Sequence, residues 1–279
     1  MGLIRLVHPF PSLLDGLVVA GVAVVATGDL STALRLGASM TALQASIGAV
    51  NDLRDAPADA GHKPGKPLPA GIVGRHSAAA LAASASGLGL LLAGPSGVVL
   101  IALAVVVLGI GYTYDLVAKG TAWSWVPFAV GIPILPLYGW LGAAGSVPTW
   151  FAALLPMALL AGGSLAIANA RADMARDAAA GIGSVALALG SGRSWWAGAL
   201  SMGAALVLAV TWLLTTGRGT PVAAGIVSLG AILAAAGLAL AWTPSEGRRE
   251  RAWQLQAIGT ATVAIGWILA AAISPGVGR

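Results

Sequence analysis

The sequence contains nine apolar stretches, each long enough as a helix to cross a lipid bilayer, and mostly short polar segments separate them. The hydrocarbon core of a bilayer is about 30 Å thick, and about 20 apolar residues of α-helix span it. The stretches cover residues 10–28, 31–52, 76–94, 97–114, 122–141, 149–171, 194–215, 220–242 and 252–273. This pattern predicts an all-α integral membrane protein made of nine transmembrane helices.

Charged residues are too few to cover a water-soluble surface. They make up 9% of the chain, whereas a soluble globular domain carries about 25%. This excludes a soluble enzyme, a disordered chain and a nucleic-acid-binding domain, so we expect membrane lipids and no nucleic acid as partners. The absence of cysteine excludes disulfides, zinc–thiolate sites and iron–sulfur clusters. Residues 1–12 show no cleavable signal peptide, and we expect the first span to be retained.

The distribution of lysine and arginine predicts the topology. With a cytoplasmic N-terminus, twelve basic residues lie on the cytoplasmic side, namely Arg5, Arg54, Lys63, Lys66, Arg75, Lys119, Arg171, Arg176, Arg193, Arg248, Arg249 and Arg251. Only Arg35, Arg218 and Arg279 lie on the opposite side. Because cytoplasmic loops carry an excess of basic residues, we expect a multi-pass protein of the plasma membrane. Its N-terminus would be cytoplasmic and its C-terminus on the outer side.

An acidic pattern occurs twice, each time at the inner end of an expected span. Asn51, Asp55 and Asp59 share the spacing N-x3-D-x3-D with Asn169, Asp173 and Asp177, and Asp52 lies beside the first copy. Together these segments hold half of the ten acidic residues of the chain. Side chains four residues apart lie on one face of a helix. Each copy is therefore expected to present an amide and two carboxylates as a column.

Such columns need cationic partners, because like charges repel and carboxylates near the membrane are costly to desolvate. The arginines Arg54, Arg171 and Arg176 could supply part of that charge, and simple solvated salt bridges are the alternative interpretation. Mg²⁺ fits the oxygen ligands better, since it is held by one or two carboxylates together with substrate phosphates. Two columns facing each other would hold two such ions and a diphosphate.

The segment around the first copy resembles a known family. Asn51 to Asp59 reads N-D-x-x-D-x-x-x-D and precedes a K-P-G-K-P-L-P-A-G tail over residues 63–71. This resembles the first aspartate-rich motif of the UbiA superfamily of intramembrane prenyltransferases. Asp173 and Asp177, with the G-S-V-A-L-A-L-G segment over residues 183–190, resemble its second motif. The resemblance implies one domain over residues 1–279, a helical bundle around a central cavity, and an isoprenyl diphosphate held through Mg²⁺.

The resemblance also implies roles for individual residues. The metal ligands would be Asn51, Asp52, Asp55, Asp59, Asp173 and Asp177, and the catalytic residues would be Asp55, Asp173, Lys119 and Tyr114. Lys119 would contact the leaving diphosphate and Tyr114 would face the allylic cation. Substrate-binding residues would be Asn169, Lys119, Arg54, Lys66, Arg171 and Arg5. The chain departs from the family at Gly181, where many members carry a third aspartate, and at His8, which replaces the usual arginine before Pro9.

The expected activity is prenyl transfer to a small acceptor, with an aromatic acceptor as the first expectation. The competing expectations are a terpene cyclase without an acceptor, transfer to a polar glycerol- or sugar-phosphate, and a transporter or lipid-binding membrane protein. Asp15 is a carboxylate inside the first span, which makes it either a site residue or a helix-start acid near the interface. Pro133 and Pro136 are expected to kink the fifth span at the cavity.

Overall fold

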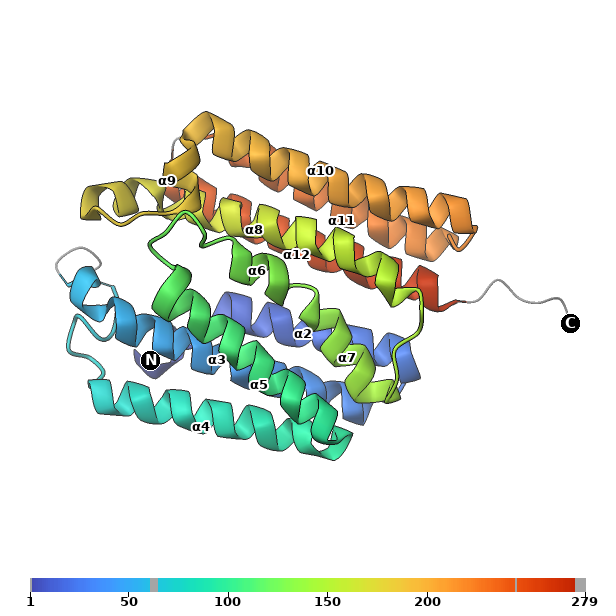
Figure 1. Cartoon of the computed structure of the whole chain (residues 1–279), viewed down its shortest axis with the longest axis horizontal. Coiled ribbons are helices and arrows are strands. Elements are labelled where there is room, and N and C mark those ends of the chain that lie inside the picture. Colours follow the sequence, from blue (N-terminus) through green and yellow to red (C-terminus); the bar gives the residue numbers. More distant parts are fainter. Residues whose placement is uncertain (1, 61–64, 244, 274–279) are drawn as a thin grey trace, which may run out of the picture. The chain divides into compact units, whose positions relative to one another are not determined.

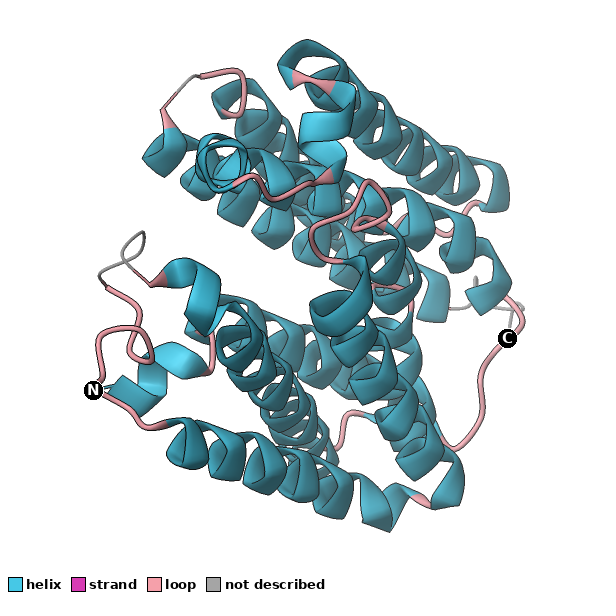
Figure 2. Cartoon of the chain, turned by 60° about the vertical axis from the view of Figure 1, so that its left-hand side comes forward, coloured by secondary structure: helices cyan, strands magenta, loops and turns pink. Residues whose placement is uncertain are grey.

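A computed structural model of the chain describes residues 2–60, 65–243 and 245–273. Every regular element in these ranges is a helix, and Figure 2 shows no strand in the same part of the chain. The expected all-α class is therefore confirmed. Three residues named in the sequence analysis lie outside the described residues. They are Lys63 and Arg279, which count in the predicted topology, and Pro64 in the tail of the first motif.

Eight of the described helical segments are long and apolar enough to cross a membrane. The second expected span, residues 31–52, forms part of helix α3 (Leu30–Asp59), which is not among them. Arg35, Gln44 and Asn51 make this helix more polar than the others. A total of nine spans stays a prediction.

Contacts between residues divide the chain into two compact units. Unit 1 comprises Met1–Val117 with Leu137–Ser146, and unit 2 comprises Ala118–Pro136 with Val147–Arg279. The expectation of a single domain over residues 1–279 stays a prediction. The first acidic motif belongs to unit 1 and the second to unit 2.

Unit 1 is built around α3. Its elements are α1 (Gly2–Leu6), α2 (Pro9–Thr27), α3, α4 (Arg75–Ala93), η1 (Gly94–Ser96), α5 (Val98–Thr113), most of η2 (Tyr114–Ala118) and most of α7 (Ile134–Ala144), as labelled in Figure 1. Helices α2 and α3 touch through Gly16 and Gly37, where a Cβ atom on either would lie 2.8 Å from the backbone oxygen of the other. Small residues let membrane helices approach this closely.

Hydroxyl groups join α3 to its other neighbours. Ser39 donates to the Gly89 carbonyl of α4 at 2.7 Å and lies 2.7 Å from the Tyr138 hydroxyl of α7. One side of α3 thus meets α4 and α7 through a polar residue inside the apolar unit. Such bonds satisfy polar groups that water cannot reach.

Unit 2 is built from the remaining helices. They are α6 (Val126–Gly131), α8 (Phe151–Ala180), α9 (Val185–Leu189), α10 (Ser191–Thr216), α11 (Pro221–Leu240) and α12 (Glu246–Ala272). Helices α11 and α12 pack against each other over much of their length. At Gly230 a Cβ atom would lie 2.7 Å from the backbone oxygen of Gly259, so this packing requires residues without side chains.

The fifth expected span, residues 122–141, is not one continuous helix. It consists of α6 and α7, which are separated at Ile132 and Pro133. Proline lacks the N–H group that a continuing helix requires. The expected distortion at Pro133 is therefore confirmed, and it is a full interruption rather than a kink.

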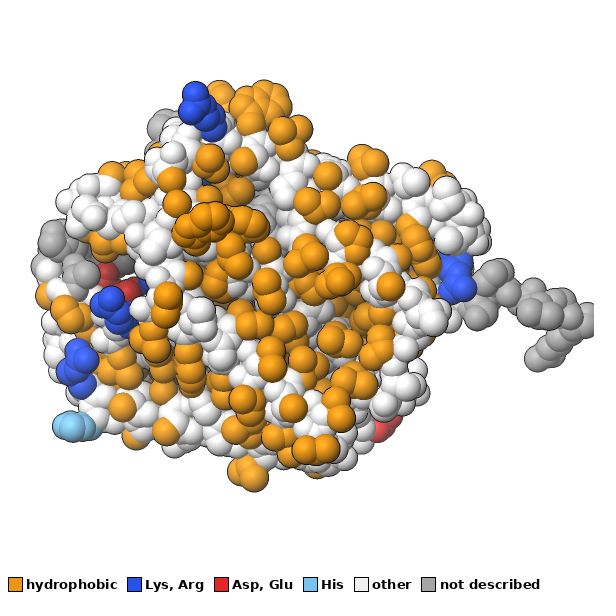
Figure 3. All heavy atoms as spheres, viewed as in Figure 1, with side chains coloured by type: hydrophobic (Ala, Val, Ile, Leu, Met, Phe, Trp, Pro, Cys, Tyr) orange, Lys and Arg blue, Asp and Glu red, His pale blue; other side chains and the backbone are white. Residues whose placement is uncertain are grey.

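Large apolar side chains remain on the outside of the helices. Leu17 in unit 1 is 68% exposed, and Leu214 in unit 2 is 76% exposed. On the face drawn in Figure 3, hydrophobic side chains prevail and charged ones are few. Helices that stay apolar on their outer side are typical of membrane spans.

Candidate active site

The first acidic motif lies on one uninterrupted helix. Helix α3 runs to Asp59, seven residues beyond the expected inner end of the span, and passes through Pro57. Asn51, Asp55 and Asp59 therefore form the expected helical column, since residues four apart share a face. Asp55 is half-buried, whereas the Asp59 residue is only 5% exposed.

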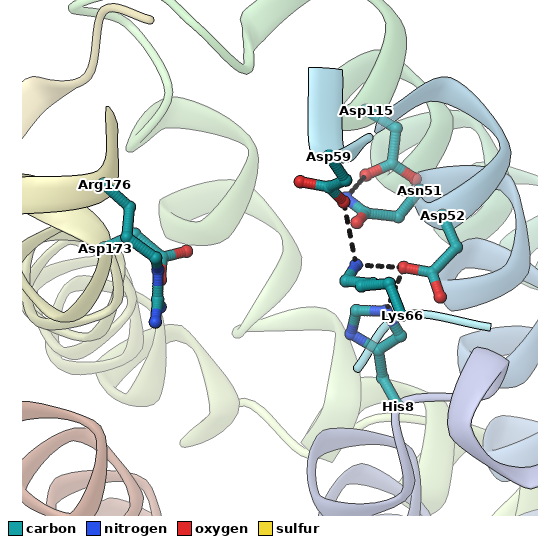
Figure 4. A network of polar contacts seen from close by, with 8 residues as sticks. All are labelled: His8, Asn51, Asp52, Asp59, Lys66, Asp115, Asp173 and Arg176. Carbon is teal, nitrogen blue, oxygen red and sulfur yellow. Dashed lines mark hydrogen bonds and ion pairs between the residues drawn. The ribbon is translucent and has the colours of Figure 1, made fainter. Parts of the chain in front are cut away.

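A lysine from outside the helix joins two carboxylates of this motif. The Nζ atom of Lys66 contacts Oδ1 of Asp52 and lies 3.6 Å from Oδ2 of Asp59 (Figure 4). Asp52 is 2% exposed. A buried carboxylate needs such a cation because water no longer stabilises its charge. Lys66, expected in substrate binding, is thus placed at the first motif.

His8 also belongs to this cluster. Its Nε2 atom lies 3.0 Å from Oδ1 of Asp52, as drawn in Figure 4. His8 precedes α2 with φ 46° and ψ 69°, a left-handed conformation that is uncommon for a residue with a side chain. The chain is close-packed here, since a Cβ atom on Gly48 would lie 3.1 Å from Cδ2 of His8. We infer that this packing holds the imidazole against Asp52.

The amide of the motif has a separate carboxylate partner. Nδ2 of Asn51 donates to Oδ1 of Asp115 at 2.6 Å (Figure 4). Asp115 is 3% exposed and lies in η2, a π-helical turn at the end of α5. Such turns are frequent at functional sites. Tyr114 begins the same turn and is half-buried.

The tail of the first motif folds back on unit 1. The Ile72 N–H donates to the Pro67 carbonyl at 2.9 Å, and Arg5 of α1 donates to the Gly65 carbonyl at 3.3 Å. Arg5, expected in substrate binding, therefore supports the loop that carries Lys66. Arg54, in the middle of the motif, is exposed.

The second acidic motif also lies on a single helix, α8, which continues to Ala180. Asn169, Asp173 and Asp177 are all half-buried and form the expected column. Asp173 is paired with Arg176 of the same helix, and Figure 4 shows this pair. Helix α8 ends in a left-handed residue, Gly181, after which the Ile182 N–H donates to the Asp177 carbonyl at 2.9 Å.

Lys119 lies in a unit 2 loop that packs against the segment after this motif. A Cβ atom on Gly183 would lie 2.6 Å from the carbonyl oxygen of Gly120, the residue after Lys119. The Val185 N–H donates to Oγ of Ser124 at 3.4 Å. Lys119 itself is half-buried. No local pattern in the sequence indicates this close approach.

Arg171, expected in substrate binding, makes contacts inside unit 2. It donates to the Ala241 carbonyl at the end of α11 at 3.0 Å and to Oγ of Ser194 at 2.6 Å. It also donates to the Ser191 carbonyl, and the residue is 3% exposed. These contacts favour a structural role in which the cation holds the C-terminal end of α11.

Two members of the first cluster were not expected there. His8 has no partner nearby in the sequence, since Asp52 follows 44 residues later. The only signal for it was its position, where the resemblance to the UbiA superfamily implies an arginine. Asp115 lies 64 residues after Asn51 in the sequence, and the structure shows it accepting a hydrogen bond from Asn51.

The first cluster has the donor chemistry that Mg²⁺ requires. Oδ2 of Asp52 is buried and has no hydrogen-bond partner among the described residues. In that same part of the chain no three His, Asp or Glu side chains converge on one point. A full protein cage is not needed, because Mg²⁺ keeps several waters and is completed by substrate phosphates. The carboxylate and amide oxygens of this motif therefore fit the ion.

Comparison with known protein families identifies the family to which the chain is similar. The model of the UbiA prenyltransferase family matches residues 16–261, which include both acidic motifs. The chain belongs to this family. The expected resemblance is thereby confirmed, and the chain is a multi-pass membrane protein of a prenyltransferase family. No match was found among curated protein sequences.

Solved structures of UbiA homologues share the fold. An apo UbiA homologue from Aeropyrum pernix K1 is 22% identical with a TM-score of 0.74, covering 94% of this chain and 97% of that one. A homologue from Archaeoglobus fulgidus bound to GPP and Mg²⁺ is 17% identical with a TM-score of 0.73, covering 97% and 100%. A structure described for digeranylgeranylglyceryl phosphate synthase is 19% identical with a TM-score of 0.69, covering 97% of both chains.

Proposed function

We propose that this UbiA family member is a Mg²⁺-dependent prenyltransferase that moves an isoprenyl group from an isoprenyl diphosphate to a small acceptor. An aromatic acceptor is the first candidate. The observation that carries the proposal is the pair of matched Asn–Asp–Asp columns on α3 and α8 in a chain of this family. The Archaeoglobus fulgidus homologue with GPP and Mg²⁺ supports the same substrate class.

In the proposed reaction the allylic carbon–oxygen bond breaks and its electron pair leaves with the diphosphate. The resulting allylic cation then forms a bond to a nucleophilic carbon or oxygen of the acceptor, whose C–H or O–H bond breaks and releases its proton to the diphosphate. Bound Mg²⁺ would neutralise the charge that develops on the leaving oxygens. The apolar walls of the bundle would keep water from the cation.

The metal ligands would be the residues of both columns and Asp52. The proposed set is Asn51, Asp52, Asp55 and Asp59 for one ion and Asp173 and Asp177 for the second, with Asp55 and Asp173 essential to catalysis. The buried Oδ2 of Asp52 supports this assignment, because an orphaned carboxylate oxygen favours a cation.

Basic and aromatic residues would handle the rest of the substrate. Lys119 would contact the leaving diphosphate, in a loop packed against the segment after the second motif. Tyr114, beside the buried Asp115, would present its ring to the allylic cation. Lys66 would bridge carboxylate and phosphate oxygens. We also assign Asn169, Arg54 and Arg5 to diphosphate binding, and for Arg171 the contacts favour a structural role at the end of α11.

The proposed architecture is nine spans around a central cavity within one domain. The N-terminus and the acidic motifs would lie on the cytoplasmic side of the plasma membrane and the C-terminus outside. The excess of basic residues in the segments assigned to the cytoplasm supports this topology.

A polar glycerol-phosphate acceptor is the second candidate. The fold similarity to a digeranylgeranylglyceryl phosphate synthase favours it over a cyclase or a transporter. A terpene cyclase would need no acceptor, and a transporter would move its ligand without changing it. These differences in product separate the candidates.

The test is an assay of the purified protein in lipid vesicles with Mg²⁺, a panel of prenyl diphosphates, and aromatic, glycerol-phosphate and sugar-phosphate acceptors. Mass spectrometry should find a prenylated acceptor, and a chelator should abolish it. A hydrocarbon product without any acceptor would instead indicate a cyclase. Uptake of ligand into vesicles without chemical change would contradict the proposal.

A further inference from the structure

Asp15 is a carboxylate inside the first membrane span, and the proposed reaction does not yet use it. It lies six residues after Pro9, the first residue of α2, or about 9 Å along the helix axis. Helix α2 is one of the apolar spans. An ionisable group at such depth is costly and usually marks a site. A helix cap is not its role, because α2 begins well before it.

Asp15 lies on the protein-facing side of α2. Residues three, four and seven positions later share its helical face, and these are Val18, Val19 and Val22, which are 8%, 0% and 0% exposed. The opposite side carries Leu13 and Leu17, which are 56% and 68% exposed. Asp15 is therefore partly exposed although it lies on the packed side of the helix and not on the lipid-facing side.

The same face of α2 packs on α7 further along the span. A Cβ atom on Gly139 of α7 would lie 2.6 Å from the Val19 carbonyl oxygen and 3.1 Å from Cβ of Val22. Asp15 lies one turn before this contact, toward the start of α2. It is therefore beside the α2–α7 packing within unit 1, at a point that stays partly accessible.

The carboxylate has no protein partner in the described part of the chain. Within residues 2–60, 65–243 and 245–273, Asp15 makes no hydrogen bond and no ion pair. The neighbouring polar residue on the helix, Ser12, is satisfied by the Val7 carbonyl at 2.6 Å. Polar groups at such positions are normally hydrogen-bonded. The carboxylate of Asp15 is therefore available to bind a ligand.

We propose that Asp15 binds the acceptor by accepting a hydrogen bond from its hydroxyl group. This inference rests on the proposed function and names the acceptor class as a small molecule with a hydroxyl donor, either a phenol or an alcohol. The position suits that role, because His8, the residue before α2, contacts Asp52 of the first motif. Gly16, the residue after Asp15, packs against Gly37 of α3, well before the first motif on that helix, so an acceptor held by Asp15 would lie further along the span than that motif.

Three variants test this role. Asp15→Leu removes the hydrogen bond, Asp15→Asn keeps an acceptor oxygen without the charge, and Asp29→Asn changes an exposed acid outside either motif as the matched control. With a para-hydroxyphenyl compound or a glycerol phosphate as acceptor, Asp15→Leu should raise the acceptor KM about 10- to 100-fold. Asp15→Asn should restore part of the affinity. The KM for prenyl diphosphate should not change in any variant. The acceptor whose KM rises in Asp15→Leu identifies the bound group as that of a phenol or of an alcohol.

Measurements of protein stability test the role of Asp15 independently of turnover. A binding carboxylate without a protein partner costs stability, so Asp15→Leu should raise the unfolding temperature in detergent. A structural role would make the same variant less stable. The hydroxyl acceptor alone should raise the unfolding temperature of the wild type and have no effect on Asp15→Leu.

The outcomes separate the two proposals. Loss of stability in Asp15→Leu, an unchanged acceptor KM, or equal stabilisation of wild type and variant by the acceptor would each overturn the role of Asp15. If the wild type shows no Mg²⁺-dependent transfer, the proposed function fails, and the two stability measurements still decide whether Asp15 binds a hydroxyl compound.

Discussion

The two acidic motifs share one spacing and differ in their surroundings. In unit 1, Asp52 and Asp59 are nearly buried and meet Lys66, which lies outside their helix. In unit 2, the Asp173 side chain is 39% exposed and pairs with Arg176 of its own helix. The same sequence pattern therefore produces a tertiary ion network in one unit and a local ion pair in the other.

Because of this difference, the ion pairs of the two motifs are expected to contribute unequally to the stability of the protein. A buried charge without its partner is strongly destabilising, whereas exposed pairs contribute about 0–1 kcal/mol. We infer that the first motif is fixed by the fold of unit 1 before any ligand binds. We expect the second motif to exchange its arginine for another cation at little cost.

The largest expected effect concerns turnover and is common to both motifs. Asp55→Ala and Asp173→Ala should each lower Mg²⁺-dependent prenyl transfer by at least ~100-fold, because each removes a proposed ligand of the Mg²⁺ ions. Transfer is measured by mass spectrometry, and size-exclusion chromatography checks that the variants remain folded. Asp29→Ala is the control and should keep full turnover. Normal turnover in either motif variant would refute the metal assignment.

The next effect concerns stability and should differ between the motifs. Lys66→Met leaves Asp52 and Asp59 without their shared cation and should lower the free energy of unfolding by roughly 1–3 kcal/mol. Arg176→Met should lower it by about 0–1 kcal/mol. Denaturant unfolding in detergent measures both losses. Added Mg²⁺ should reduce the loss in Lys66→Met, because it can replace the lysine cation beside Asp52 and Asp59. Equal losses in the two variants would mean that burial does not distinguish the motifs.

Unit 2 buries a cation, Arg171, where unit 1 buries acids, and this contrast gives a third test. Arg171→Met should cost roughly 1–3 kcal/mol of unfolding free energy, because the carbonyls of Ser191 and Ala241 lose their donor. Arg171→Lys should recover only part of this, since lysine lacks the planar fork that reaches several acceptors. If instead Arg171→Lys keeps full stability but weakens diphosphate binding, the substrate-binding interpretation of Arg171 is the correct one.

The sequence predicted the helices and the acidic columns because both depend on local spacing. Asn51, Asp55 and Asp59 need only a continuous helix to share a face, and Pro133 was enough to indicate a distortion. Long-range pairings have no such local signal. The contact of His8 with Asp52 joins residues 44 positions apart, and that of Arg171 with Ala241 joins residues 70 apart.

The smallest effect belongs to the control acid in unit 1. Asp29 precedes α3 and accepts hydrogen bonds from Thr32 and Ser31, which lower its pKa below the usual 3.8. Its ionised form therefore stabilises the fold at pH values above 3.8, and this contribution is lost as the pH falls through the lowered pKa. Asp29→Asn should unfold at a slightly lower temperature than the wild type at pH 7, and the difference should disappear in strong acid. A difference that persists there would mean that the cap acts through its shape and not its charge.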